Sequence, residues 1–156
     1  MGGGSSHEKG KVDRMKLIET SLQIALRAYA GKTDKAGREY ILHPLRVMAK
    51  MNTDLERSAA LLHDVIEDSD ITAGDLLAEG IPPEVVEAIQ YLSKSEGEDY
   101  QDFVARAKRN KIAAKVKIAD IEDNIDVLRL SSLDEWDLAR IKKYHTAWRL
   151  LKDDLP

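Results

Sequence analysis

Residues 61–68 place two doublets of ionisable side chains, His63-Asp64 and Glu67-Asp68, four positions apart inside an apolar run. At about 100° per residue, a helix gathers these four side chains within an arc of about 140° on one face. The apolar residues of the run can anchor the same helix in a hydrophobic core. The segment is therefore predicted to be a core helix whose polar face serves chemistry.

Helical periodicity extends through nearly the whole chain. Apolar residues recur at helical spacing, and no segment alternates as a half-buried strand does. We therefore expect an all-α fold in one domain, residues 13–156, preceded by a flexible leader, residues 1–12. The expected helices cover about residues 13–30, 44–51, 54–69, 73–80, 83–93, 100–109, 111–130 and 133–151. The last helix is expected to turn six apolar side chains inward: Trp136, Leu138, Ile141, Tyr144, Trp148 and Leu151.

Composition excludes several classes of protein. The 156 residues fit one domain with a substantial core. A formal net charge of −4 argues against a general nucleic-acid binder, because such proteins neutralise phosphates with an excess of Lys and Arg. The absence of cysteine excludes disulfides, thiolate metal sites and a Cys nucleophile. Without a run of about 18 apolar residues or a signal peptide, the chain is expected to be cytoplasmic and to have no membrane partner.

Two segments distant from residues 61–68 complete a candidate metal site. His43 lies upstream in a Tyr-Ile-Leu-His-Pro stretch, and Asp120 lies downstream within residues 115–124. With His63 and Asp64 they form a set of two imidazoles and two carboxylates. Such a set suits Mn²⁺, Fe²⁺ or Zn²⁺ better than Ca²⁺ and leaves positions open for water and a phosphate oxygen.

The order His, His-Asp, Glu-Asp, Asp resembles the HD phosphohydrolase superfamily. Within it, residues 40–45, 61–68 and 116–124 resemble motifs of the hydrolase domain of RelA/SpoT enzymes and of the small alarmone hydrolases. The resemblance implies an HD-type helical bundle with a divalent metal, for which Mn²⁺ is favoured. It also implies a (p)ppGpp 3′-pyrophosphohydrolase of the stringent response, which releases pyrophosphate and leaves GDP or GTP.

Catalytic and substrate-binding roles follow from position and from the resemblance. Glu67 and Asp68 lie next to the metal pair, and their expected work is to deprotonate a water or protonate the leaving oxygen. The matching pair of the family is regarded as catalytic. Asn124 shares the helix face of Asp120, and the matching Asn of the family contacts the nucleotide. Three cations are candidate ligands of the phosphorylated nucleotide: Lys35, Arg38 and Arg46.

Two positions depart from the family pattern. Asp34 stands where a base-stacking Arg is expected, and a carboxylate cannot stack as a guanidinium does. Asp126 replaces another expected Arg, and both Asp123 and Asp126 are predicted to be flanking or solvent residues. The departures fall on the base and ribose side of the expected site and leave the metal set intact.

Alternatives therefore stay open at this point. One is an HD phosphohydrolase for another nucleotide or a phosphorylated cofactor such as NADPH. Another is a nucleotide-sensing HD module without turnover, although the intact Glu67-Asp68 pair speaks against it. The oligomeric state is also open, with a homodimer as one alternative.

Overall fold

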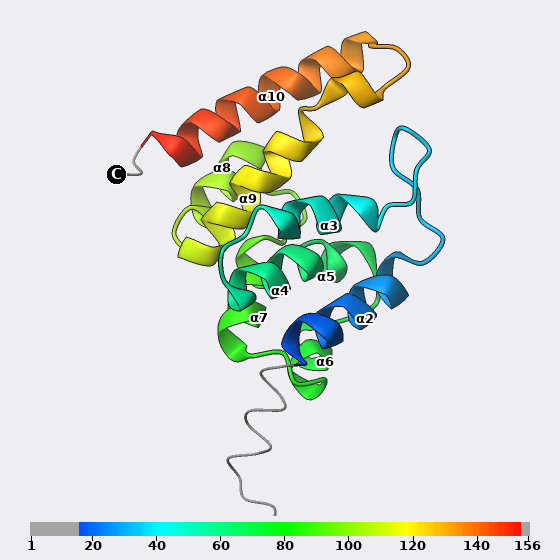
Figure 1. Cartoon of the computed structure of the whole chain (residues 1–156). Helices are drawn as coiled ribbons and strands as arrows, with labels where there is room; N and C mark the ends of the chain where they lie inside the picture. The colour runs from blue at the N-terminus through cyan, green and yellow to red at the C-terminus, as the bar shows by residue number, and fades with distance from the viewer. Residues whose placement is uncertain (1–15, 154–156) are drawn as a thin grey trace, which may run out of the picture.

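The computed structural model describes residues 16–153, so the predicted leader lies outside the described residues. The described chain is helical, with no strand between residues 16 and 153 and one isolated bridge between Thr33 and Glu39. The prediction of an all-α fold in a single helical domain is confirmed (Figure 1). The elements are α2 (Leu17–Tyr29), α3 (Leu42–Ala49), α4 (Asp54–Leu62), α5 (Val65–Asp68), α6 (Ala73–Ala78), α7 (Pro83–Tyr91), α8 (Tyr100–Ala107), α9 (Lys111–Asn124), the 3-10 turn η1 (Val127–Arg129) and α10 (Glu135–Lys152).

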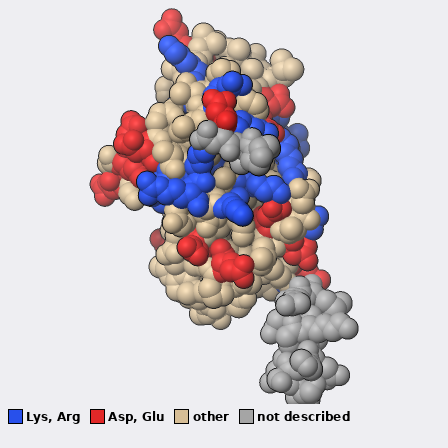
Figure 2. Space-filling view, turned by 90° about the vertical axis from the view of Figure 1, so that its left-hand side faces the viewer, with Lys and Arg blue, Asp and Glu red and all other residues tan. Residues whose placement is uncertain are grey.

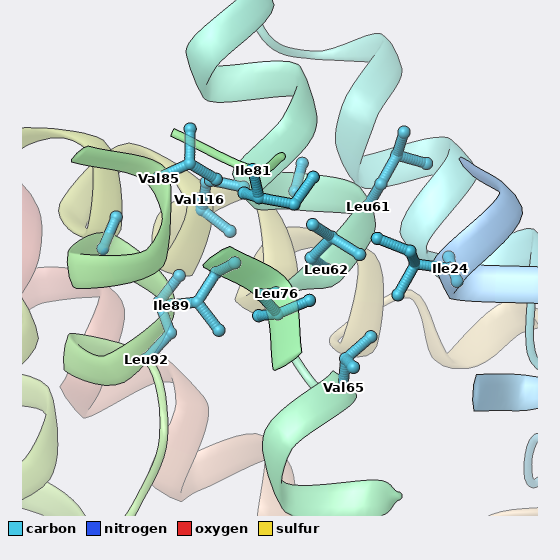
Figure 3. Packing of buried hydrophobic residues seen from close by; sticks show 14 of the residues in the cluster. Ile24, Leu61, Leu62, Val65, Leu76, Ile81, Val85, Ile89, Leu92 and Val116 are labelled. Carbon is cyan, nitrogen blue, oxygen red and sulfur yellow. The ribbon is translucent and has the colours of Figure 1, made fainter. Parts of the chain in front are cut away.

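Helix α4 is the centre of the main core. It packs against α2, α3, α7 and α9, and its last four residues, 59–62, are fully buried. Figure 3 shows Leu61 and Leu62 among side chains from neighbouring helices, such as Ile24 of α2 and Leu76 of α6. Each buried Leu contributes roughly 1.5–3 kcal/mol relative to an exposed one. The residues that follow α4 are therefore held in place by the core.

Side-chain caps begin the helices where the sequence predicts them. Thr53 accepts a hydrogen bond from the backbone N–H of Glu56, whose carboxylate accepts the Thr53 N–H in return. Thr72 caps α6 in the same way. The Glu56 carboxylate also accepts a bond from Lys115 Nζ at 2.8 Å, which ties the start of α4 to α9.

The predicted continuous helix over residues 54–69 is wrong, because the helix breaks at His63 and Asp64. In an uninterrupted helix the carbonyl of Ala60 would accept the N–H of Asp64. Here that carbonyl lies 2.6 Å from His63 Nδ1, and the Asp64 N–H donates to the hydroxyl of Tyr29 at 3.2 Å. The Ala60 carbonyl and the Asp64 N–H, which no longer bond to each other, thus both have other partners. The break contains His63 and Asp64, whereas Glu67 and Asp68 lie on the next helix, α5.

The end of α9 and the first half of α10 also differ from prediction. Helix α9 ends at Asn124 rather than near residue 130. Figure 1 shows α10 lying over α8 and α9. Its second half packs there through Ala147 and Leu151, in a smaller apolar cluster of its own. Trp136 and Leu138, predicted to face inward, are 59% and 55% exposed because the first half of α10 lies outside that cluster.

No described helix combines the length and apolar character needed to cross a bilayer.

Candidate metal centre and its cavity

The four predicted metal ligands lie together. His43 Nε2 is 2.8 Å from Asp120 Oδ1, and His63 Nε2 is 3.4 Å from the same oxygen. The ligand atoms of these three buried residues all lie within 4.8 Å of one another. Asp64 joins them through its Oδ2, which is 3.0 Å from His63 Nε2. The donors come from the start of α3, the break after α4 and the middle of α9, as an ion surrounded by protein requires.

The helix break presents one nitrogen of His63 to this centre. Because the Ala60 carbonyl accepts from Nδ1, the ring nitrogen Nε2 faces the carboxylates of Asp64 and Asp120. Within the described part of the chain, this buried nitrogen has no hydrogen-bond partner. A lone pair facing two carboxylates is unfavourable unless a positive charge stands between them. These residues therefore fit a divalent cation held by nitrogen and oxygen donors.

The pKa shifts of His63 and Asp120 also indicate that this centre favours positive charge. Burial opposes the charged form of His63, but Asp64 and Asp120 raise its pKa well above the usual value. Burial likewise opposes ionisation of Asp120, yet the Lys117 ammonium, 2.9 Å from Oδ2, and the imidazoles hold the pKa of that carboxyl well below its usual range. Asp120 is therefore an ionised oxygen donor, and the imidazoles beside it face negative charge.

Asp123 has a place that the sequence reasoning missed. Its carboxylate is buried, with Oδ2 lying 2.6 Å from His43 Nδ1 and Oδ1 accepting from Arg46 Nε at 2.7 Å. The prediction that Asp123 is a flanking or solvent residue is wrong, whereas Asp126 is exposed as expected. The available signal was spacing, since Asp123 follows Asp120 by three residues and so shares its helix face.

A cavity of about 450 Å³ opens in front of the metal centre. His43, Asp64 and Asp120 line one end of it, and Glu67 and Asp68 lie beside them. The remaining wall is rich in cations, contributed by the 33–36 loop, α3, α9, η1 and α10: Lys35, Arg46, Lys117, Arg129, Arg140 and Lys143.

Lys and Arg side chains alone do not distinguish this cavity from the rest of the surface. Figure 2 shows Lys and Arg side chains also gathered across the face at the left of Figure 1, where α8, α9 and the end of α10 lie. What distinguishes the cavity is that its cations share the lining with the buried side chains of His43, Asp120 and Asp123.

The predicted catalytic pair lies on α5, just beyond the helix break. Burial raises the pKa of Glu67, and the nearby Asp64 raises it further. Burial and Asp64 raise the pKa of Asp68 in the same way. Glu67 also accepts a hydrogen bond from the backbone N–H of Lys94. Both carboxyls face the cavity with a raised affinity for a proton, as groups that exchange protons with a substrate require.

The predicted substrate-binding residues have different surroundings. Lys35 and Asn124 line the cavity, and Lys35 Nζ lies 2.9 Å from the ring centroid of Trp136. Arg46 lines it too, but its guanidinium binds Asp123. Arg38 is exposed beside Glu39 and is not one of the residues that line the cavity.

Asp34 builds the loop in which it departs from the family pattern. Its Oδ1 accepts the backbone N–H groups of Ala36 and Arg38, each at 2.9 Å. Gly37 completes the turn with a φ of 80°, a backbone conformation that favours glycine. The carboxylate therefore shapes the loop that carries Lys35 to the cavity.

Several residues of the cavity wall were not predicted. Trp136, Arg140 and Lys143 come from α10, and Arg129 from the turn before it. They lie outside the three motifs, and no regular spacing connects them to the metal ligands. Only the packing of α10 over α9 brings them to the site.

Known proteins provide independent comparisons. No protein-family profile matches the chain. A Vibrio cholerae protein named guanosine-3′,5′-bis(diphosphate) 3′-pyrophosphohydrolase is 35% identical over an alignment of 129 residues, and the alignment covers 74% of this chain and 18% of that protein. The bifunctional (p)ppGpp synthase/hydrolase SpoT of Escherichia coli K12 is 35% identical over 130 residues, with the same coverage. The chain thus spans less than a fifth of the length of these relatives.

A solved structure agrees with the fold. It is described as a metazoan ortholog of SpoT that hydrolyses ppGpp and plays a role in starvation responses. It superposes with a TM-score of 0.68 at 21% identity, over 98% of this chain and 87% of that one. The resemblance inferred from the motifs is confirmed: the chain is similar in sequence to the RelA/SpoT-type hydrolases over 74% of its length, and the solved structure has the same helical fold.

Proposed function

We propose that this protein is a metal-dependent phosphohydrolase that removes pyrophosphate from the 3′ position of (p)ppGpp and leaves GDP or GTP. The observation that carries the proposal is the shared cavity, which is lined by His43, Asp64 and Asp120 of the metal cluster and by two carboxyls of raised pKa, Glu67 and Asp68. The names of the relatives support the choice of substrate.

The residues present fit a divalent metal, and we propose Mn²⁺. The donor set has two imidazoles and two carboxylates and no thiolate, which suits Mn²⁺ among the biological divalent ions. Bound there, the ion supplies polarisation of a phosphoryl oxygen and a lowered pKa of water. His63 is held for this role by the Ala60 carbonyl, and Asp120 by Lys117.

The other side chains of the cavity handle protons and orient the substrate. Glu67 and Asp68 exchange protons with the attacking water and the leaving oxygen, because burial and Asp64 raise the pKa of both carboxyls. Asn124 is positioned by two bonds from its amide nitrogen to Asp120, and its amide oxygen is an acceptor for a substrate hydroxyl. Lys35, which also lines the cavity, attracts a phosphate of the substrate.

One observation favours a second candidate, hydrolysis of another phosphorylated nucleotide or of a cofactor such as NADPH. The carboxylate of Asp34 is used within its own loop, so this position offers no guanidinium plane to a guanine. Trp136, which also lines the cavity, has an aromatic ring, and such a ring can stack on any base.

The test is a substrate panel. Purified protein is depleted of metal, reloaded with Mn²⁺ and offered ppGpp, NADPH, deoxynucleoside triphosphates and a generic phosphodiester, with products resolved by chromatography. Pyrophosphate and GDP from ppGpp alone are expected. Phosphate released from NADPH with ppGpp untouched would support the second candidate. Metal binding without turnover of any substrate would support a nucleotide sensor.

A further inference from the structure

The two imidazoles of the metal centre are held by different kinds of partner. His63 Nδ1 lies 2.6 Å from the neutral carbonyl of Ala60. His43 Nδ1 lies 2.6 Å from a carboxylate oxygen, Asp123 Oδ2. His43 and Asp123 are 5% and 7% exposed, so little water competes for this bond. One ligand therefore has a charged partner behind it and the other does not.

The Asp123 carboxylate is itself held on several sides. Arg46 donates from Nε to Oδ1 at 2.7 Å and from Nη2 to Oδ2 at 3.0 Å, in the paired geometry that Arg and a carboxylate favour. Arg129 places Nη1 3.5 Å from Oδ1 and donates from Nη2 to the backbone carbonyl of Asp123. The carboxylate cannot rotate without losing at least one of these contacts.

We propose that Asp123 is a positioning residue that orients His43 as a metal ligand, and that Arg46 and Arg129 act on the metal through Asp123. With Nδ1–H donated to Asp123, Nε2 is left as the ligand atom, and it points at Asp120 Oδ1 from 2.8 Å. A carboxylate behind a ligating imidazole fixes the ring and increases its basicity. The inference rests on the metal site of the proposed function.

This assignment gives Arg46 a different role from the one its sequence position predicts. If Arg46 binds the substrate, its substitution should change KM and leave the affinity for the metal unchanged. An Arg46 that holds Asp123 would change metal affinity in the absence of any substrate. Binding of Mn²⁺ to the full chain at one fixed pH, measured by calorimetry, separates the two roles.

The decisive variant is Asp123→Asn, which keeps an oxygen acceptor but removes the charge and places an amide against Arg46. We expect it to weaken Mn²⁺ binding about 10- to 100-fold. Arg46→Gln should give a smaller loss, and Arg46→Lys should recover part of it. In the double variant, Arg46→Gln should add nothing to Asp123→Asn, since one acts through the other.

The matched control is Asp126→Asn, which makes the same change three residues further along the chain. Asp126 also lines the cavity, but it is exposed. It should bind Mn²⁺ as the wild type does. Circular dichroism of the metal-free proteins checks folding. If Asp123→Asn does not fold, the Mn²⁺ affinity of Arg46→Gln decides the test. This variant is expected to fold because the Arg46 side chain is 36% exposed.

The outcomes separate this inference from the proposed function. A wild type that binds no Mn²⁺ overturns the metal site and the inference together. A wild type and an Asp123→Asn variant with equal affinity overturn the inference alone. An Arg46→Gln variant with raised KM and unchanged Mn²⁺ affinity overturns the role of Arg46 as a support of Asp123.

Discussion

The two ends of the cavity are built in opposite ways. At the metal end, three of the four metal ligands are backed by another group: His43 by Asp123, His63 by the Ala60 carbonyl and Asp120 by Lys117. At the cationic end, Lys35 lies on an exposed loop, and its partner Trp136 is 59% exposed in the half of α10 outside the apolar cluster. The proposed metal site is thus held by the core, whereas the proposed substrate ligand Lys35 and its partner Trp136 lie on exposed segments.

The largest expected effect is at the metal end. Asp64→Ala removes a donor that faces His63, and the proposed hydrolysis of ppGpp should fall by about 10³-fold or more, because metal assistance is worth several kcal/mol. Steady-state kinetics with Mn²⁺ present measures it. A variant that keeps full activity would exclude the metal mechanism.

A smaller loss is expected at the proton-handling residues beside the metal. Glu67→Gln removes a carboxyl whose pKa burial raises, and kcat should fall by about 10²-fold or more. The affinity for Mn²⁺ should stay near that of the wild type, because Glu67 is not among the clustered metal donors. An equal loss of metal affinity and kcat would move Glu67 from proton transfer to metal binding.

The cationic end should show a different kinetic signature. Lys35→Ala removes a charge from the cavity wall, and KM for ppGpp should rise by about tenfold with kcat little changed. Arg38→Ala is the matched control from the same loop, since Arg38 is not one of the residues lining the cavity. A larger rise in KM for Arg38→Ala than for Lys35→Ala would reverse the assignment made from the structure.

The smallest expected effect is a loss of stability on substitution of Glu56, which joins the start of α4 to Lys115 of α9. Burial opposes ionisation of Glu56, but Lys115 and the N–H groups of Asn52 and Thr53 lower its pKa. Glu56→Gln should cost about 1–2 kcal/mol in the free energy of unfolding at pH 7, through loss of the cap and the ion pair.

The pH dependence of this cost has a definite sign. A carboxyl with a folded-state pKa below its unfolded value of about 4.3 stabilises the protein above that pH. The difference between wild type and Glu56→Gln should therefore be complete at neutral pH and shrink as the pH falls below about 4. Urea unfolding across pH 3–7 measures it, and a constant difference would contradict the ionised pair.

Much of the fold was accessible from local patterns. Apart from the break at His63-Asp64, the helices between Leu42 and Ala107 begin and end near their predicted positions, because caps such as Thr53 and Thr72 and the helix-initiating Pro83 act within one turn. The break at His63-Asp64 was not accessible, since nothing local forbids a helix there. It depends on Tyr29, which supplies a hydroxyl for the Asp64 N–H from 35 residues away.

The sequence by itself determined the helical class, the four clustered donors and the acidic pair beside them, because these follow from residue type and from spacing along the chain. Only the tertiary structure decided which groups stand behind the donors and which cations reach the cavity. Asp123 meets His43 because α3 and α9 pack together, and Arg38, a predicted substrate ligand, is exposed and is not one of the residues that line the cavity. These placements depend on contacts between residues far apart in the chain. The spacing of Asp123 from Asp120 places both on one helix face, but it does not indicate that Asp123 meets His43.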